Sequence, residues 1–385
     1  MKIAIPKERR VHETRIAGTP DTVKRLVGMG LEVVVEAGAG AAASFPDDAF
    51  VAAGATIAPD EAAALGAADI VLKVQRPLLG GDDRVDEVAL MKPGAVLVGM
   101  LQPLQNATDV AAYAKAGIVS FAMELVPRIT RAQSMDVLSS QSNLAGYKAV
   151  LDATAEFGRA FPMMMTAAGT IPPARVLVMG AGVAGLQAIA TARRLGAIVS
   201  ATDVRYAAKE QVESLGASFL AVDLEAMKAM ETKGGYAKEM GEDFAKRQRE
   251  HVTEALKKID IVICTALIPG RKAPILITKD MLAALKPGSV VVDLAVEQGG
   301  NCEGSKLAKV VTTSGGVKIV GHANVPGRIA VDASQLYGRN LVAFLGLLFD
   351  KEKNFKIDTA DEIIKATLLT QGGAVVNPQL AATGA

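Results

Sequence analysis

Cysteine and histidine are scarce in this sequence. Its 385 residues include two cysteines, Cys264 and Cys302, which lie in separate segments without a CxxC spacing. This argues against a disulfide framework and against a zinc site. We interpret both as structural thiols in a reducing cytosol. The three histidines, His12, His251 and His322, are scattered, and we interpret each as a surface or structural residue.

Long hydrophobic runs are also absent. The longest, Leu341 to Phe349 (LVAFLGLLF), falls far short of the roughly 18 apolar residues that a membrane helix needs. The amino-terminal segment MKIAIPKERR lacks the long apolar stretch of a secretory signal. We therefore predict a cytoplasmic protein without direct membrane insertion, so that any role at a membrane comes through a partner.

The chain carries no charge excess of either sign. Lys and Arg number 42 and Asp and Glu 41, which argues against a partner such as nucleic acid or an anionic membrane face. Half of the residues are hydrophobic, enough to bury a large core. A chain of this length and composition favours two domains.

Short apolar runs alternate with helical patterns from the start to about residue 122. This alternation predicts a parallel sheet with helices on both faces. The first helix has Thr19 as its N-cap and Pro20 at its first position, and Gly28 or Gly30 can end it. The apolar runs span residues 3–5, 32–36, 69–74, 95–99 and 117–122.

Helical spacing from Met135 to Phe161 predicts one long helix that crosses between domains. A second alternating series begins at Arg175, and a further helical segment, residues 333–348, is expected to return to the first domain. We predict an α/β protein of two doubly wound, Rossmann-like domains joined by long helices, with NAD in the cleft. The domains are expected to span residues 1–136 plus 325–385, and 137–324.

A glycine motif follows the first strand of the second series. The apolar strand Arg175 to Met179 runs directly into Gly180-Ala181-Gly182-Val183-Ala184-Gly185, which opens a helix. Gly180 permits the tight turn, Gly182 lets the backbone approach a pyrophosphate, and Gly185 allows close packing of helix and strand. The amino terminus of the helix then offers free N–H groups to the phosphates. The motif predicts dinucleotide binding.

An acidic residue stands at the end of the next strand. Asp203 follows residues 198–202, where a carboxylate accepts hydrogen bonds from the adenosine ribose hydroxyls and repels a 2′-phosphate. Arg205 lies nearby and can pair with such a phosphate, which leaves NADP as the alternative. The pattern favours NAD(H).

Three segments, residues 122–150, 167–205 and 293–301 (DLAVEQGGN), closely resemble the NAD(H)-binding soluble alpha subunit of bacterial proton-translocating NAD(P) transhydrogenase. That subunit is related in fold to alanine dehydrogenase. The resemblance implies hydride transfer between NAD(H) bound here and NADP(H) on a partner subunit, because no second GxGxxG is present. It also implies a membrane-spanning subunit that couples transfer to proton translocation, a homodimer, and a peripheral position at the cytoplasmic face of the inner membrane.

The resemblance assigns catalytic positions near the nicotinamide ring. Gln and Ser side chains can hold a carboxamide, and an Arg paired with an Asp can supply an oriented charge pair. The alternative is a capped helix start with ordinary surface polar residues. The positions are Arg128, Gln133, Asp136 and Ser139.

The resemblance also assigns cofactor contacts beyond the glycine motif. Residues 226–244 resemble a mobile loop that closes over nucleotide, the alternative being a solvated loop without function. Ala266 and Leu267 follow a strand and are expected to line the adenosine and ribose path. The full expected set is Gly180, Ala181, Gly182, Val183, Gly185, Asp203, Val204, Arg205, Gly235, Tyr236, Met240, Gln248, Ala266 and Leu267.

Two other functions remain open on the sequence. An alanine dehydrogenase-like oxidoreductase needs a proton donor, usually a histidine, and by resemblance Gln102 stands at or near its place. Glutamine cannot exchange a proton, although by resemblance Arg15 and Lys73 keep the substrate-clamping positions. A non-catalytic nucleotide-binding protein would need no ordered nicotinamide, and so the cluster from Arg128 to Ser139 argues against it.

Overall fold

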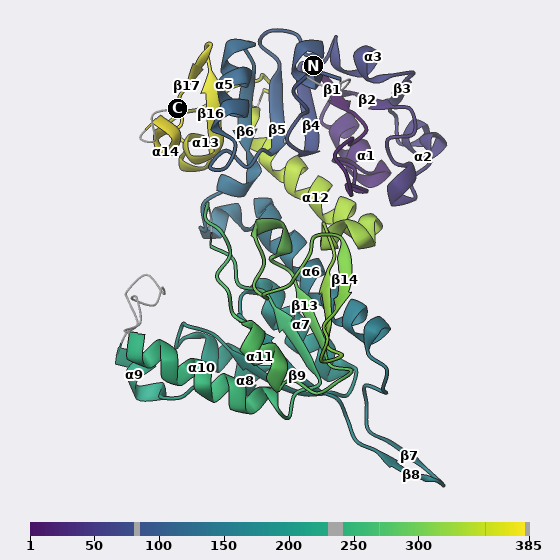
Figure 1. Cartoon of the computed structure of the whole chain (residues 1–385). Helices are drawn as coiled ribbons and strands as arrows, with labels where there is room; N and C mark the ends of the chain where they lie inside the picture. Colours follow the sequence, from purple (N-terminus) through teal and green to yellow (C-terminus); the bar gives the residue numbers. More distant parts are fainter. Residues whose placement is uncertain (81–84, 230–241, 269, 351, 382–385) are drawn as a thin grey trace. The chain divides into compact units, whose positions relative to one another are not determined.

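The computed structural model describes residues 1–80, 85–229, 242–268, 270–350 and 352–381. The chain divides into two compact units, Met1–Gln141 with Pro326–Ala385 (unit 1) and Ser142–Val325 (unit 2). Each unit is built around its own large sheet (Figure 1). The predicted fold class of doubly wound parallel sheets is confirmed.

The unit 1 sheet has eight strands in the order β17-β16-β6-β5-β4-β1-β2-β3. The six amino-terminal strands are parallel, and β16 and β17 add an antiparallel edge. The order reverses between β1 and β4. Strand bounds are β1 Lys2–Ile5, β2 Glu32–Glu36, β3 Thr56–Ala58, β4 Ile70–Gln75, β5 Val96–Met100, β6 Val119–Ala122, β16 Leu368–Gln371 and β17 Ala374–Val375.

Helices cover both faces of this sheet because alternate residues of each strand are apolar. Ile3 and Ile5 of β1 belong to one buried cluster with α1, α2 and α12, whereas Ala4 faces α3, α4 and α5. The bounds are α1 Pro20–Gly28, α2 Asp47–Ala52, α3 Glu61–Leu65, α4 Glu87–Leu90, α5 Ala107–Lys115, α12 Ala330–Leu345, α13 Glu362–Thr367 and α14 Pro378–Ala381.

The first helix begins and ends as its sequence predicts. Thr19 caps α1 in a capping box with Thr22, and Pro20 is its first residue. The helix ends at Gly28, and Gly30 turns the chain with a φ of +88°. These signals are local, which is why the sequence alone specified them.

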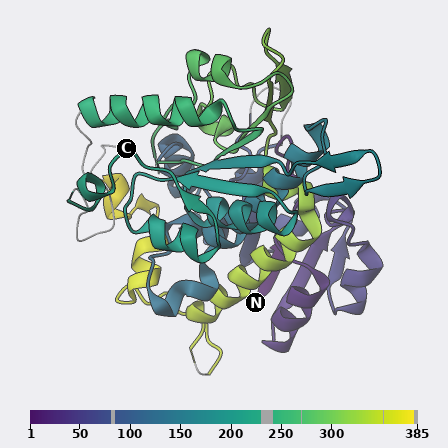
Figure 2. The ribbon, with the colours of Figure 1, turned by 90° about the horizontal axis from the view of Figure 1, so that it is seen from below.

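The unit 2 sheet has seven strands in the order β11-β10-β9-β12-β13-β15-β14. All pairs are parallel except β14 with β15, and the order reverses between β9 and β12. A separate hairpin, β7–β8, projects from the unit (Figures 1 and 2). The bounds are β7 Met164–Thr166, β8 Gly169–Ile171, β9 Arg175–Met179, β10 Ile198–Thr202, β11 Ser218–Phe219, β12 Ile261–Cys264, β13 Val290–Asp293, β14 Lys309–Thr312 and β15 Lys318–Gly321.

The two faces of the unit 2 sheet bury different residues of the same strands. Val176 and Val178 of β9 pack with α6, α7 and α8, and Leu177 and Met179 pack with α10 and α11. Figure 2 shows α10 on one side of this sheet and α7 on the other. The bounds are α6 Val137–Glu156, α7 Val183–Arg194, α8 Ala208–Ser214, α9 Leu224–Ala229, α10 Glu242–Leu256 and α11 Lys279–Ala284.

The long helix α6 is shorter than its apolar spacing predicts. A 3₁₀ segment, Thr130–Met135, precedes it, and the helix ends at Glu156 rather than at Phe161. Gly158 and Pro162 follow, and these residues favour the end of a helix over its continuation. Apolar spacing alone does not register such an end, since Phe157 and Phe161 remain buried beyond it.

Candidate functional site

The glycine motif forms a tight turn between β9 and α7 in unit 2. Gly180 has a φ of +98°, a conformation that L side chains rarely adopt, and a Cβ there would lie 2.7 Å from Thr265 Oγ1. A Cβ on Gly185 would lie 1.8 Å from the Gly180 carbonyl oxygen. Both glycines are therefore required by the chain itself, independent of any ligand.

Gly182 has a different environment. It is the N-cap of α7 and provides no side-chain cap, and a Cβ on it would meet nothing within 4 Å. Space for a phosphate and the free N–H groups of the first turn thus coincide at this residue. Ala181 is buried, and Val183 is exposed beside the turn.

Asp203 is bound to the glycine turn. Its carboxylate, largely buried, accepts hydrogen bonds from the Ala181 N–H at 2.7 Å and from the Arg205 N–H at 2.8 Å. The Arg205 guanidinium adds bonds of 3.0 Å to both carboxylate oxygens and one of 3.2 Å to the Ala181 carbonyl. Arg205 is therefore neutralised by Asp203, while Val204 between them is exposed. This pairing weakens the case for a 2′-phosphate at Arg205.

The segment after β12 forms the other side of the switch point. Thr265 donates a hydrogen bond to the Gly180 carbonyl at 2.8 Å, and Leu267 is 48% exposed. Ala266 is held through both its N–H and its carbonyl by the side chain of Asn301. Sequence reasoning did not single out Asn301, although a buried polar residue after the Gly299-Gly300 turn could have drawn attention to it.

Gln248 lies on α10 with its side chain used inside unit 2. Its amide donates to Thr202 Oγ1 at 3.2 Å and its carbonyl oxygen accepts from the Val222 N–H at 2.9 Å. It thereby fixes α10 next to the end of β10, one residue before Asp203. The expected contacts Gly235, Tyr236 and Met240 lie outside the described residues.

The expected nicotinamide cluster lies in unit 1 around the start of α6. Asp136 accepts hydrogen bonds from the Ser139 N–H at 2.8 Å and the Ser139 hydroxyl at 2.6 Å, so it caps the helix. Arg128 and Gln133 are exposed. Among the contacts of the described residues none joins Arg128 to Asp136, contrary to the charge pair expected from the sequence. The helix N-cap uses the carboxylate first because it is nearest.

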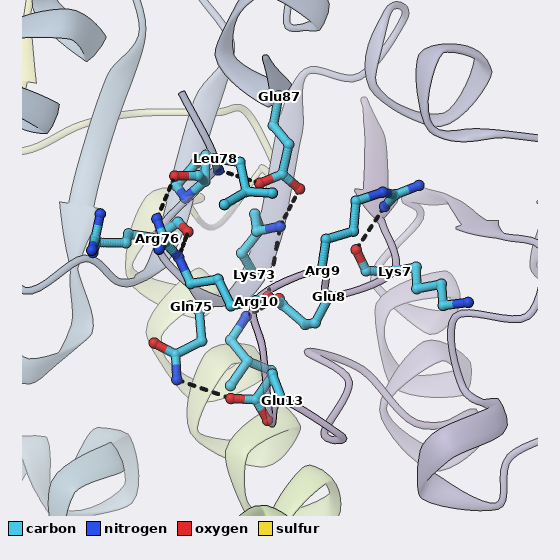
Figure 3. Close-up of polar contacts among 12 residues, drawn as sticks. Lys7, Glu8, Arg9, Arg10, Glu13, Lys73, Gln75, Arg76, Leu78 and Glu87 are labelled. Atoms are coloured by element: carbon cyan, nitrogen blue, oxygen red, sulfur yellow. Dashed lines mark hydrogen bonds and ion pairs between the residues drawn. The ribbon is translucent and has the colours of Figure 1, made fainter. Parts of the chain in front are cut away.

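The two cations that resemble a substrate clamp are both neutralised within unit 1. Arg15 is 4% exposed and forms two hydrogen bonds of 2.8 and 2.7 Å with Glu13, whose carboxylate also accepts from Gln75. Lys73 is 1% exposed and lies 2.5 Å from Glu87 and 3.6 Å from Glu8 (Figure 3). A substrate carboxylate would have to displace these internal partners.

Gln102 lies just beyond the end of β5 and is exposed, with a φ of +49°. Its N–H and that of Leu101 donate hydrogen bonds to the carboxylate of Glu124. Burial raises the pKa of Glu124 to about 7, but both of its oxygens are bound by backbone N–H groups. We therefore assign Glu124 a structural role at this strand end. Of the histidines, His12 and His251 are exposed and His322 is half-buried.

Unit 1 buries more carboxylates than cations. Burial raises the pKa of Glu61 to about 8, and a hydrogen bond with the Glu87 carboxyl raises it further, against the nearby charge of Arg9. For Glu87 burial alone would raise the pKa, but Lys73 and the hydrogen bonds lower it. Burial also raises the pKa of Glu8 to about 7, partly offset by Lys73. At neutral pH Glu61 thus keeps its proton.

This arrangement predicts a pH-dependent stability that Glu61→Gln removes. A folded-state pKa above the unfolded value adds stability below the unfolded pKa, and this stability is lost as pH rises from about 4.5 through about 8. Because one pKa unit corresponds to about 1.4 kcal/mol, the variant should gain on the order of 2 kcal/mol over the wild type at pH 9 relative to pH 5. Urea unfolding at a series of pH values measures this difference. Glu32→Gln, an exposed substitution in the same unit, serves as control, and parallel pH profiles for Glu61→Gln and the wild type would refute the assignment.

Two family models cover nearly the whole chain. Residues 4–145 match the alanine dehydrogenase/PNT N-terminal domain, and residues 149–378 match the alanine dehydrogenase/PNT C-terminal domain. The chain belongs to the alanine dehydrogenase/PNT family. Within this family it is 61% identical over 386 residues to an NAD(P) transhydrogenase subunit alpha of Rhodospirillum rubrum, covering 100% of both chains.

Other members of the alanine dehydrogenase/PNT family are less similar. The alanine dehydrogenase of Halomonas elongata is 32% identical, over 91% of this chain and 88% of that protein. Among solved structures, transhydrogenase from Sinorhizobium meliloti matches with a TM-score of 0.88 and 53% identity, over 98% of this chain and 100% of that one. The predicted resemblance to the transhydrogenase alpha subunit is thus confirmed. Within the portion of the chain that the structure describes, no helix combines the length and apolarity needed to cross a bilayer.

Proposed function

We propose that this chain is the NAD(H)-binding subunit of a proton-translocating NAD(P) transhydrogenase. Hydride passes between NAD(H) bound here and NADP(H) on a partner subunit, and a membrane-spanning subunit couples the transfer to proton movement. The observation that carries nucleotide binding is the joined geometry of the Gly180 turn and Asp203. The 61% identity over the full chain to a transhydrogenase alpha subunit favours this reaction over that of alanine dehydrogenase.

The residues at the switch point of unit 2 fit an NAD(H) molecule. The first turn of α7 offers N–H groups to the pyrophosphate next to the open space at Gly182. Asp203 is positioned at the end of β10 to accept the ribose hydroxyls, with Arg205 neutralised beside it. Val204, Ala266 and Leu267 supply apolar contact for the adenosine.

The chemistry requires no proton donor from this chain. NADH supplies a hydride from C4 of its nicotinamide, and the acceptor is the same carbon of another nicotinamide, so no heteroatom changes protonation. The residues of this chain have only to hold the ring and its carboxamide, a role that we assign to Gln133, Ser139, Asp136 and Arg128. Gln102 at the end of β5 and the neutralised Arg15 and Lys73 agree with a site that does not act on a keto acid.

We further propose that the subunit is a homodimer held at the cytoplasmic face of the inner membrane by its partners. The β7–β8 hairpin supports the dimer, since an isolated two-stranded hairpin is at best marginally stable in water. Met163 beside it and Met165 within it are 60% and 79% exposed, an apolar surface that a second copy would cover. Light scattering of the purified chain measures the mass directly, and a monomer at micromolar concentration would contradict the dimer.

Asp203→Ala is expected to weaken NADH binding and to reduce discrimination against NADPH. The substitution removes a charged acceptor, worth about tenfold or more in affinity, and frees the Arg205 guanidinium for a 2′-phosphate. Fluorescence titration with both nucleotides measures the two dissociation constants. In the double variant with Arg205→Ala the NADH defect should persist while any gain for NADPH disappears. Unchanged NADH affinity would remove Asp203 from the ribose site.

The proposed function is tested by mixing the chain with a purified NADP(H)-binding transhydrogenase domain. We expect NADPH to reduce an NAD analogue only when both proteins are present. The same chain supplied with pyruvate, ammonia and NADH should show no oxidation of NADH. Turnover in this second assay would instead favour an alanine dehydrogenase, and NADH binding without turnover in either assay would favour a nucleotide-binding protein without catalysis.

A further inference from the structure

Asp293 at the end of β13 is a buried anchor for the loop that follows. It is 1% exposed, and its carboxylate accepts hydrogen bonds from the N–H groups of Ala295, Asn301 and Cys302 at 2.9 to 3.1 Å. Gly300 has a φ of +83°, and a Cβ there would lie 2.8 Å from the Asp293 carboxylate. The loop therefore folds back on the carboxylate, which fixes where Asn301 lies.

Asn301 is fully buried, and its side-chain amide is completely used. It accepts a hydrogen bond from the Ala266 N–H at 3.0 Å and donates to the Ala266 carbonyl at 2.9 Å and the Pro274 carbonyl at 2.8 Å. The amide thus pairs with one peptide group of the chain after β12 as a neighbouring strand would. A buried amide that satisfies all its partners defines one conformation of the segment it holds.

The segment held by Asn301 also contacts the glycine turn. Thr265 donates to the carbonyl of Gly180, and Leu267, two residues further, exposes its side chain at the carboxyl edge of the sheet. A chain of hydrogen bonds therefore runs from Asp293 through Asn301 to Ala266 and on to the turn at Gly180.

We propose that Asn301 is the positioning residue that holds Thr265 to Leu267 as one wall of the nucleotide site. It acts through Ala266 and does not itself contact the nucleotide, and the inference rests on the proposed function in taking this edge as the NAD(H) site. When the amide is lost, the segment must be ordered at the moment of binding, and the affinity for NADH falls.

Asn301→Ala is expected to raise the dissociation constant for NADH about tenfold, because the lost amide leaves a mobile wall to be ordered on binding. In the absence of nucleotide, amide hydrogen exchange of peptides covering Thr265 to Ile268 should become faster. Should Asn301→Ala prove unfolded by circular dichroism, the isosteric Asn301→Asp, which loses both donors, takes its place in both measurements.

Asn377→Ala is the matched control, since it separates positioning from a general loss of packing. Asn377 is 1% exposed, donates to the carbonyls of Ala366 and Leu368 at 3.0 Å and accepts from the Gln379 N–H at 3.1 Å, all in unit 1. A similar loss of thermal stability with wild-type NADH affinity is expected for this variant.

Two results would overturn the inference, and they differ from a failure of the proposed function. Wild-type NADH affinity in Asn301→Ala is one, and unchanged exchange from Thr265 to Ile268 is the other. A wild-type chain that binds no NADH would contradict the proposed function. The exchange measurement needs no nucleotide, and so it would still decide whether Asn301 holds the segment.

Discussion

Gly185→Ala is expected to abolish NADH binding. The added methyl group would lie 1.8 Å from the Gly180 carbonyl oxygen and 3.3 Å from Thr265 Oγ1. Neither the carbonyl nor the helix can retreat without opening the turn, because both are backbone at the junction of β9 and α7. A shift of even about 1 Å moves the N–H groups of the first turn away from the phosphates, and we expect affinity to fall by about a hundredfold or more.

A companion variant separates loss of folding from loss of binding. Gly182→Ala places its methyl in open space, so it should fold like the wild type and still bind NADH poorly, because the methyl occupies room that the pyrophosphate requires. Gly28→Ala, at the end of α1, also meets nothing within 4 Å and should leave binding unchanged. Calorimetric titration with circular dichroism on all three variants tests this, and wild-type affinity in Gly182→Ala would place the pyrophosphate elsewhere.

Arg128→Ala and Asp136→Asn should slow hydride transfer by about a hundredfold while changing NADH affinity by only a few-fold, because they act on the orientation of the ring. Arg128 is exposed and its removal leaves no buried partner unsatisfied. Asp136→Asn weakens the two hydrogen bonds to Ser139 that order the start of α6. The measurement is the single-turnover rate with an NADP(H)-binding transhydrogenase domain, beside a direct NADH titration.

Arg131→Ala is the control for these two variants. Arg131 is an exposed arginine three residues from Arg128, but its guanidinium is paired with Asp361 at 2.7 Å and lies 3.6 Å from Glu362. Its removal should leave the transfer rate nearly unchanged. Equal losses of binding and rate in the Arg128 and Asp136 variants would assign those residues to affinity rather than to the reaction.

The central strands of both sheets could be predicted from the sequence, and the peripheral ones could not. Runs such as Val96 to Met100 and Val290 to Asp293 are apolar on both faces, a pattern that only a buried parallel strand produces. The edge strands β3, β14 and β17 are short or exposed and carry no such pattern. They form because a neighbouring strand offers unpaired N–H and carbonyl groups, which is a tertiary effect.

The polar contacts of the site divide in the same way. The glycine turn and Asp203 were evident because each follows its strand at a fixed distance in the chain. Asn301 lies 35 residues from Ala266, and no spacing connects them. The same holds for Lys73, whose positive charge suggested a free anion site until Glu8 and Glu87 were found against it.

The amino-acid sequence alone determined the β–turn–α nucleotide motif, the cap of α1 and the parallel-sheet class, because each of these follows from neighbours along the chain. The pairing of Arg205 with Asp203, the proton on Glu61 and the clamp of Asn301 on Ala266 arose only in the folded protein. They depend on burial and on side chains that meet across the sheet, and desolvation then sets which groups are charged and which backbone is held still.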